Sequence, residues 1–526
     1  MRKALLILLA LALLTSVFVS CNNDPKTVTV TFNPGNAEGE PYTQTVVSGV
    51  STKLTENKFK NEGYGLVGWS LSPTGGHDYD NEEEVTLTSD LNLFAVWSKL
   101  YYIHAGETEE GTVTPIFGTY MESDKDLFVS VRVIPKNDDY YLSAVNLDGS
   151  ENKAADFYDY YFKIFIPRHT TGDITINPVF LPKPSEVQYR KAEWNGTEVV
   201  TSDESWTGTY SLVHSYTTNW TAGWYVVMEN NVEIAGRITV SGDVNLIICD
   251  GKTLEAIKGI SVREGSSLTI YGQTGGTGKL EINGVDYGNA GIGSDKDTNC
   301  GTINICGGNI ITFGGEAGAG IGGGAQRNGG TINVLYGTVT ATGGKGAAGI
   351  GGGDHGEGGT INLYGGTVNA SSASGGAGIG GGQYASGGTI TISGATVNSQ
   401  GGDYSAGIGG GQYYGHGGTI TITAGNVTAK GSREAAGIGG GYHGDGANVT
   451  ISGGTINATG GSGYVDVGVM AYNVAIGAGS PAVAHNGLTL GDGVALEVKG
   501  PEEGAVWQDY DGNTRYYQMR TKQPTT

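Results

Sequence analysis

The sequence predicts an all-β protein in which two small β modules precede a parallel β-helix solenoid. Glycine makes up 94 of the 526 residues against only 13 prolines, and the tripeptide Ala-Gly-Ile returns at nearly constant spacing. Its isoleucines are Ile292, Ile321, Ile350, Ile379, Ile408 and Ile438, at intervals of 29, 29, 29, 29 and 30 residues. A fixed period of this length is typical of one structural unit stacked on copies of itself.

The composition describes an ordered and acidic chain. Hydrophobic residues make up 38% and charged residues 16% of the sequence, and the formal net charge is -22. A partner held through phosphate groups needs lysine and arginine to release counterions, so the charge argues against nucleic acid as a partner. We expect the negative charge to keep an exposed protein soluble.

The N-terminus carries a targeting signal. A basic start at residues 1–3 precedes an apolar run over residues 4–19, and a cysteine follows at Cys21. Residues 1–20 resemble a bacterial lipoprotein signal peptide, which implies cleavage before Cys21, lipidation of that cysteine with palmitate, and a lipidated tether over residues 21–26. The alternatives are an ordinary signal peptide or a short transmembrane anchor, although about 16 apolar residues are few for a spanning helix.

Residues 27–98 are expected to form one small module. The sequences VTFNPGN at 30–36, GYGLVGWS at 63–70 and LTSDLNLFAVW at 87–97 resemble the internalin-type B-repeat, also called the Listeria-Bacteroides repeat. The resemblance implies a β-grasp-like spacer module of surface proteins. We expect Trp69 and Trp97 to pack in its core, because each lies in a segment where aromatic and outward polar residues alternate.

Three further parts complete the predicted chain. Residues 99–181 resemble a divergent copy of the same module, through GTVTPI at 111–116 and LFVSVRVIP at 127–135. Residues 182–187 are predicted to be a linker, because two prolines within it cannot continue a central strand. The β-helix is predicted over residues 188–500, and residues 501–526 are predicted to be a C-terminal cap or tail.

Aromatic residues are dense at the start of the predicted helix. They are Trp206, Tyr210, Tyr216, Trp220, Trp224 and Tyr225. We expect these side chains to form an apolar cap over the open end of the solenoid.

The repeating unit, most regular over about residues 290–460, predicts three short extended segments with a glycine corner at each change of direction. In the unit 379–407, residues 389–392 and 395–399 supply two segments and Ile379 begins the third. Glycine suits corners that need a positive φ or a close backbone approach. Stacking at about 4.8 Å would pair each strand with its copies and bury the isoleucines, each worth ~1.5–3 kcal/mol. By analogy with known β-helices we expect a right-handed coil.

No metal site or cofactor is predicted. A calcium-binding β-roll needs an aspartate every nine residues, and between residues 379 and 442 Asp403 stands alone. Asp295, Asp297 and Asn299 have the spacing of a calcium loop but lack its glycine and its final glutamate, so we expect a polar turn there. Cys249, Cys300 and Cys306 are expected to be buried and unpaired, because a strand between the last two holds them too far apart for a disulfide.

A catalytic alternative stays open, because many β-helices are pectin-degrading lyases or hydrolases. Such enzymes need a carboxylate cluster with a base, or two carboxylates facing one bond. The repeats offer only scattered charges, and Gly415-His416-Gly417 matches a short polygalacturonase motif without its aspartate partners. We therefore expect no catalytic residues.

The variable loop after each Gly-Gly-Gly supplies the candidate binding residues. Its second position is Gln326, His355, Tyr384, Tyr413 and His443 in successive units, and Asp354, Gln383, Gln412 and Tyr442 stand beside four of them. If the units stay in register, these side chains form a stripe along one edge of the helix. Aromatic faces stack on sugar rings, and amides bond to hydroxyl groups, so such a stripe could hold a linear glycan. The alternative is that these are ordinary solvated loop residues.

Together these observations predict a non-catalytic, lipid-anchored protein of the bacterial cell envelope, on the outer membrane or cell surface. Its helix resembles AGIGGG-repeat surface proteins and carbohydrate-binding β-helices with a pectate-lyase-like fold. The expected role is an adhesin or glycan-binding module, with a polysaccharide or a surface ligand of a host or neighbouring cell as partner. The alternatives are a polysaccharide lyase or hydrolase, and a structural stalk without a ligand.

Overall fold

The computed structural model describes residues 25–115, 118–122, 126–137, 139–147, 150–152, 157–158, 161–465, 469–472, 475–478, 488–490 and 495–499. These residues form strands, turns and loops, which confirms the predicted all-β class, and none of them forms a helix able to cross a membrane. Two compact units are present: residues 1–105, 115–129 and 165–176, and residues 106–114, 130–164 and 177–526. The predicted signal peptide, Cys21 and the predicted tail at 501–526 lie outside the described residues.

The first unit is built on a mixed sheet. Its strands are β1 (Thr27–Asn33), β2 (Tyr42–Val47), β4 (Tyr64–Ser70) and β6 (Leu91–Ala105), with β3 (Ser51–Lys53) and β5 (Glu84–Thr86) paired beside them. β1 runs antiparallel to β2 and parallel to β6. Trp69 is fully buried and meets the ring of Phe32 edge-on at 4.8 Å, and half-buried Trp97 donates from its indole nitrogen to the Pro34 carbonyl. Both tryptophans therefore serve the core, as predicted.

The next part of the chain is also made of strands. They are β7 (Gly111–Pro115), β8 (Thr119–Met121), β9 (Leu127–Pro135), β10 (Tyr140–Leu147), β11 (Ser150–Asn152), β12 (Phe157–Tyr158), β13 (Tyr161–Ile166) and β14 (Ile174–Pro182). The expected boundary between residues 98 and 99 falls inside β6, which continues to Ala105.

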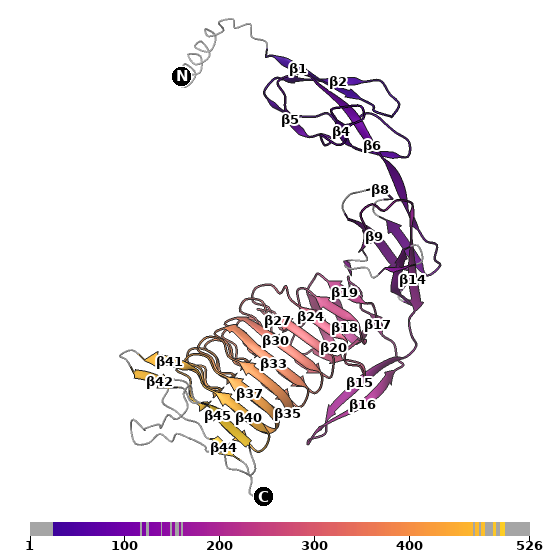
Figure 1. The fold of residues 1–526 in the computed structure, drawn as a ribbon. Helices are drawn as coiled ribbons and strands as arrows, with labels where there is room; N and C mark the ends of the chain where they lie inside the picture. The colour runs from indigo at the N-terminus through magenta and orange to yellow at the C-terminus, as the bar shows by residue number, and fades with distance from the viewer. Residues whose placement is uncertain are drawn as a thin grey trace, which may run out of the picture. The chain divides into compact units, whose positions relative to one another are not determined.

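The β-helix consists of coils that each contribute three strands (Figure 1). The first strand stack contains β23 (Ser267–Tyr271), β26 (Thr302–Ile305), β29 (Thr331–Val334), β32 (Thr360–Leu363), β39 (Asn448–Ile451) and the first halves of β35 (Thr389–Gln400) and β37 (Thr419–Lys430). The second strand stack contains β24 (Lys279–Ile282), β27 (Asn309–Phe313), β30 (Thr338–Lys345), β33 (Thr367–Ser374), the second halves of β35 and β37, and β40 (Thr455–Thr459). The third contains β25 (Ile292–Gly293), β28 (Ile321–Gly322), β31 (Ile350–Gly351), β34 (Ile379–Gly380), β36 (Ile408–Gly409) and β38 (Ile438–Gly439). All of these pairings between coils are parallel. Most join residues 29 apart, as predicted, but Ser267 pairs with Thr302, 35 residues on, and Thr389 with Thr419, 30 residues on.

The inward side chains form one continuous core. Ile379 pairs with Ile350 below and Ile408 above, and all three are fully buried. Alternation in the other stacks points Val368 and Ala370 inward and Asn369 outward. The isoleucine ladder predicted from the sequence is therefore confirmed.

Glycine in the third stack lets the coils approach one another. Gly380 has a φ of 134°, and an added Cβ would overlap the carbonyl oxygen of Gly409, its partner in the next coil. The same conflict recurs at Gly322, Gly351 and Gly409. No other residue fits here, because the conformation is left-handed and the space is filled by backbone.

Residues 188–206 were predicted to lie inside the helix, but together with Val187 they form a separate hairpin. β15 (Val187–Trp194) pairs only with β16 (Val199–Trp206) among the described strands. The hairpin packs on Cys306 and Leu335, and Trp194 stacks on Tyr364 at 4.6 Å. The hairpin covers the position that follows the first-stack strand in successive coils, namely Cys306, Leu335 and Tyr364. In the coils beyond the hairpin this position is polar. The residues there are Ser393, Thr423 and Ser452, and the Thr423 hydroxyl donates to that of Ser393 at 2.9 Å.

The residues of the predicted aromatic cap divide between the core and a side wall of the first coils: Trp220 and Tyr225 stack at 5.2 Å in the core. Trp220 is fully buried in the helix core, on β18 (Asn219–Val227). Trp206 and Trp224 stack on each other at 4.2 Å and pack with Val226 and Ile247 on the outside of the first coils. Since Leu246 and Ile248 face the core, Ile247 between them faces outward, and the aromatic cluster covers a side wall instead of the open end.

The glycine column yields a first prediction. We expect Gly380→Ala to lower the unfolding free energy by more than about 3 kcal/mol. The added methyl group would overlap the backbone of the next coil, and alanine would have to adopt the positive φ of this position. Gly265→Ala is the matched control: its φ is 82° but no atom lies within 4 Å of the added Cβ, so about 1–2 kcal/mol is expected. Urea unfolding followed by circular dichroism measures both, and equal losses would contradict the close approach of the coils.

The hairpin yields a second prediction, on cysteine reactivity. Cys306 and Cys300 are unpaired and buried, and burial raises the pKa of each thiol to about 12. Only Cys306 lies under the hairpin, with its thiol 3.8 Å from the Ala192 carbonyl. We expect Trp194→Ala to loosen the hairpin and speed alkylation of Cys306 at least tenfold, with Cys300 unchanged. Mass spectrometry of iodoacetamide-treated protein reads both sites, and equal rates at Cys306 in both proteins would refute the packing role.

Candidate functional site

The loops after Gly-Gly-Gly stack in register along the helix. The second residue of each loop has a positive φ, between 58° and 62°; these residues are Gln326, His355, Tyr384, Tyr413 and His443. This backbone is uncommon outside glycine. It is held by hydrogen bonds between coils: the His355 amide donates to the Gln383 carbonyl at 3.0 Å, and the Tyr384 amide to the Gln412 carbonyl at 2.7 Å.

In-register loops bring the predicted rings together. His355 and Tyr384 stack at 4.8 Å and Tyr384 and Tyr413 at 5.3 Å between centroids. Each inner ring is therefore covered on its faces by its neighbours, although Tyr384 remains 50% exposed. A ligand would meet ring edges and phenol hydroxyls here, whereas the sequence analysis expected open ring faces.

One extra residue changes the register in the coil that begins at Ile408. The Tyr414 amide donates to the Tyr442 carbonyl at 2.8 Å, which is the bond that Tyr384 makes one coil earlier. Tyr414 stacks on His443 at 5.3 Å, while Tyr413 stacks back on Tyr384. The sequence analysis missed Tyr414; the 30-residue interval between Ile408 and Ile438 was the signal for this insertion.

The remaining predicted residues flank the rings. Gln383 donates to the side chain of Gln412 at 2.9 Å, and the carboxylate of Asp354 lies 3.0 Å from Nδ1 of His355. The Gln326 amide donates to the Asp354 carbonyl at 2.6 Å. Tyr442 meets Tyr413 edge-on at 5.8 Å. The name loop column is used below for Gln326, Asp354, His355, Gln383, Tyr384, Gln412, Tyr413, Tyr414, Tyr442 and His443.

Two further residues join the C-terminal end of the loop column and were not identified from the sequence. Tyr404 lies 5.3 Å from Tyr442, and its carbonyl accepts from the Tyr442 amide at 3.0 Å. Burial raises the pKa of Glu434, and the nearby His443 acts in the opposite direction. Each lies in the loop before the Ala-Gly-Ile of its coil, on the N-terminal side of the third-stack strand. The residues predicted from the sequence lie in the loop on the C-terminal side of that strand.

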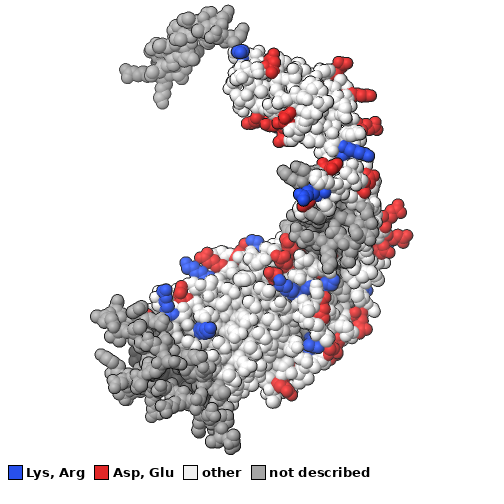
Figure 2. Space-filling model, viewed as in Figure 1, with Lys and Arg blue, Asp and Glu red and all other residues white. Residues whose placement is uncertain are grey.

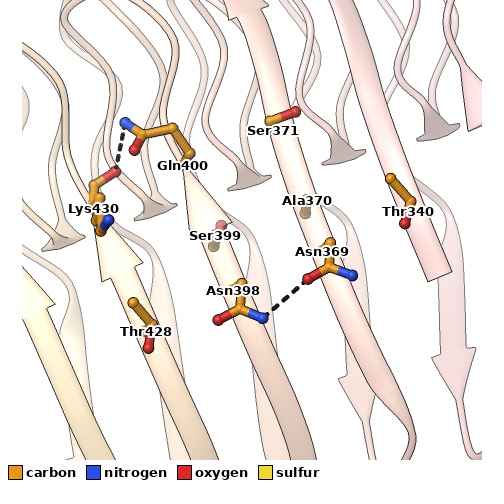
Figure 3. Close-up of a pocket in the computed structure, with 9 residues that line it drawn as sticks. All are labelled: Thr340, Asn369, Ala370, Ser371, Asn398, Ser399, Gln400, Thr428 and Lys430. Carbon is orange, nitrogen blue, oxygen red and sulfur yellow. Dashed lines mark hydrogen bonds between the residues drawn. The ribbon is translucent and has the colours of Figure 1, made fainter. Parts of the chain in front are cut away.

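A second surface, which the sequence analysis did not identify, is a shallow groove on the second strand stack. It has a volume of about 280 Å³ and crosses β30, β33, β35 and β37 (Figure 3). Its lining is Thr340, Asn369, Ala370, Ser371, Asn398, Ser399, Gln400, Thr428 and Lys430. We call these nine residues the polar groove.

Strand register places like groups above one another in the polar groove. Asn369 pairs with Asn398, and the Asn398 amide donates to the Asn369 side-chain oxygen at 3.0 Å. This bond occupies one polar atom of each side chain, so each amide has another group for a ligand. Gln400 donates to the Lys430 carbonyl at 3.4 Å. Figure 3 shows these side chains side by side on successive strands.

An exposed aromatic ring lies at the N-terminal end of the same face. Phe313 ends β27, is 43% exposed and pairs in register with Thr342, whose hydroxyl lies 3.2 Å from that of Ser371. A flat apolar ring beside hydroxyl and amide groups suits a sugar, which has apolar C–H faces and polar edges.

The predicted polar turn at Asp295 is held by cations of the protein itself. Asp295 accepts from Arg237 at 2.6 Å, from Ser261 at 2.8 Å and from Arg263 at 3.3 Å. Burial alone would raise the pKa of Asp295, but the charge of Arg237 and these hydrogen bonds outweigh it and lower the pKa. Across the described residues no three His, Cys, Asp or Glu side chains are grouped to hold a metal ion.

Comparison with known families now adds to the geometry. Residues 29–96 match the family model of the Listeria-Bacteroides repeat domain. The N-terminal module is a Listeria-Bacteroides repeat domain. Residues 337–354, 358–383, 390–412, 420–442 and 449–480 match the beta helix repeat, which agrees with the parallel stacks described above. Comparisons with curated proteins and with solved structures give no significant match.

The ion cluster at Asp295 yields a third prediction. Because its native pKa is below the unfolded value of about 3.9, its stabilising contribution is present at neutral pH and is lost as the pH falls through the native pKa. We expect Asp295→Asn to cost about 2–4 kcal/mol at pH 7 and much less once the pH falls below the lowered native pKa of Asp295. Exposed Asp297→Asn is the control and should cost nothing measurable. A loss at Asp295 that is independent of pH would contradict the ion pair, and calcium-dependent stabilisation abolished by the substitution would restore the metal hypothesis.

Proposed function

We propose that this protein is a bacterial cell-surface lipoprotein that binds an extended glycan along the second strand stack without cleaving it. The observation that carries the proposal is the polar groove, where amide and hydroxyl groups recur on four successive strands beside the ring of Phe313. Hydrogen-bonding side chains at regular steps, with an aromatic platform at one end, are what a linear carbohydrate requires.

The chemistry of the groove supports a binding role without catalysis. Hydrolysis of a glycosidic bond needs two carboxyl groups facing it, whereas none of the nine groove residues is acidic. His416, the remnant of the polygalacturonase motif, lies in a loop and accepts from the Asp445 amide at 3.1 Å through Nδ1. It is thus tied to its neighbouring coil instead of facing the groove side chains.

The position on the cell surface rests on the N-terminal sequence. Lipidation of Cys21 would hold the chain to a membrane, with the tether and the Listeria-Bacteroides repeat domain between that anchor and the β-helix. On this proposal the repeat domain acts as a spacer, and the glycan belongs to a host cell, a neighbouring cell or the surrounding matrix.

The loop column is a second candidate surface for the same function. Its stacked tyrosines offer exposed edges and hydroxyls, as at Tyr384 and Tyr414, which are 50% and 61% exposed. The groove is favoured because Asn398 in it is exposed and the exposed ring of Phe313 lies on the same face, whereas ring faces inside the column cover one another.

A glycan array with two double variants tests the proposal. We expect Asn369→Ala with Asn398→Ala to weaken binding about tenfold or more, since each lost hydrogen bond contributes about 0.5–1.5 kcal/mol. Thr360→Ala with Thr389→Ala is the matched control, because both are exposed on the first strand stack and away from the groove. Its binding should stay within twofold of the native protein.

Three outcomes would contradict parts of the proposal. Loss of binding in Tyr384→Ala with Tyr413→Ala, but not in the asparagine variant, would move the site to the loop column. Release of reducing or unsaturated sugar ends from a bound polysaccharide would make the protein an enzyme. No binding to any glycan on the array would remove the proposed function.

A further inference from the structure

From β30 to β40 the outward side chains of the second strand stack are almost free of charge. They are Thr338, Thr340, Thr342, Thr367, Asn369, Ser371, Thr396, Asn398, Gln400, Asn426, Thr428, Lys430, Thr455, Asn457 and Thr459. Lys430 is the one charged residue in that set, and Lys345, exposed at the C-terminal end of β30, is the other charged residue of these strands, in a chain with 52 acidic and 30 basic residues. Figure 2 shows the same contrast, with a mostly white surface over these strands and coloured side chains gathered along its borders.

This distribution disfavours an acidic ligand. A uronic acid or sulfated polymer carries a charge at many of its units and is held by several lysines or arginines. The groove offers Lys430 alone, at its edge, and a chain of net charge -22 repels a polyanion at long range. An uncharged sugar needs no such neutralisation, because its hydroxyls pair with neutral amides and hydroxyls.

The register adds a direction to the binding surface. Thr340, Asn369, Asn398 and Thr428 occupy one column, each from a successive coil. Coils follow one another at about 4.8 Å, so a ligand laid along the helix axis meets a similar set of donors and acceptors at every step. A ligand laid along one strand would instead pass Asn369 and Ser371 and then reach the end of the strand.

We propose that the ligand is a neutral, extended polysaccharide that lies along the helix axis across β30, β33, β35, β37 and β40. This inference rests on the proposed glycan-binding function and names the class of glycan. It leads to two measurable properties: affinity rises with chain length until the five strands are covered, and salt has little effect on it.

Isothermal titration calorimetry on the whole chain tests this with defined oligosaccharides. The neutral probes are oligomers of β-glucan, mannan and xylan with two to eight units, and the acidic probes are oligogalacturonate and sulfated heparin oligomers of the same lengths. We expect one neutral series to bind, with affinity rising about threefold or more per unit up to about five units, as further coils are engaged. Its dissociation constant should change less than twofold between about 50 and 500 mM NaCl.

Two variants separate charge from hydrogen bonding. Lys430→Gln should leave the small salt dependence of neutral binding unchanged, whereas Asn398→Asp, which keeps the shape but replaces the amide donor by a carboxylate, should weaken the binding about tenfold. The thermal midpoint of each variant shows whether it is folded. Asn398→Gln, which keeps the amide but displaces it by one methylene, should lose less than Asn398→Asp.

The outcomes distinguish this inference from the function on which it rests. Binding of the acidic series alone, lost in Lys430→Gln and weakened tenfold by salt, would overturn the neutral ligand and leave glycan binding intact. Neutral binding that does not grow beyond two units would overturn the axial arrangement. Absence of binding to every series, together with an empty glycan array, would remove the glycan-binding function itself.

Discussion

Everything in the β-helix depends on identical backbone paths in successive coils, and the glycine column of the third stack enforces that identity. Gly351, Gly380 and Gly409 take a left-handed conformation in which a Cβ would overlap the next coil. With this close approach fixed, the neighbouring isoleucines fall directly above one another and are fully buried. A shift of one residue in any coil would place a side chain against backbone, so the register has no nearby alternative.

The same constraint determines what the surface can be. Any outward position repeats at each coil, so a residue type that tolerates its own copy about 4.8 Å away is favoured. Threonine and asparagine do so by bonding to each other, as Asn362 to Asn333 at 2.8 Å and Asn398 to Asn369 at 3.0 Å. Like charges at that distance repel. From β30 to β40 the charged residues lie mostly in loops, and the strand faces are largely uncharged arrays of hydrogen-bonding groups. In the first coils, by contrast, Glu233, Glu255 and Glu281 pair in register.

Features that repeat in every coil could be predicted from the sequence. Features that depend on contacts between a coil and a non-repeating segment, or on the combined shape of several strands, could not. The isoleucine ladder, the three strands per coil and the unpaired cysteines follow from periodicity. The hairpin β15–β16 does not repeat. The only trace of it in the repeats is that the residue it covers changes from apolar or aromatic, as at Tyr364, to polar at Ser393 in the next coil. Tyr384 and Tyr413 were correctly expected to lie together, but which ring faces stay open depends on side-chain angles. The polar groove is a shape formed by four strands, and each strand alone has an ordinary outward pattern.

A crystal structure of the chain with a bound neutral oligosaccharide would show directly where and in which direction the ligand lies. We expect sugar rings over Asn369, Asn398 and Thr428, progressing along the helix axis with their hydroxyls within hydrogen-bonding distance of these side chains. Density for the sugar only beside Tyr384 and Tyr414, or a chain lying along a single strand, would contradict it. Either result would show which surface of the helix binds the ligand.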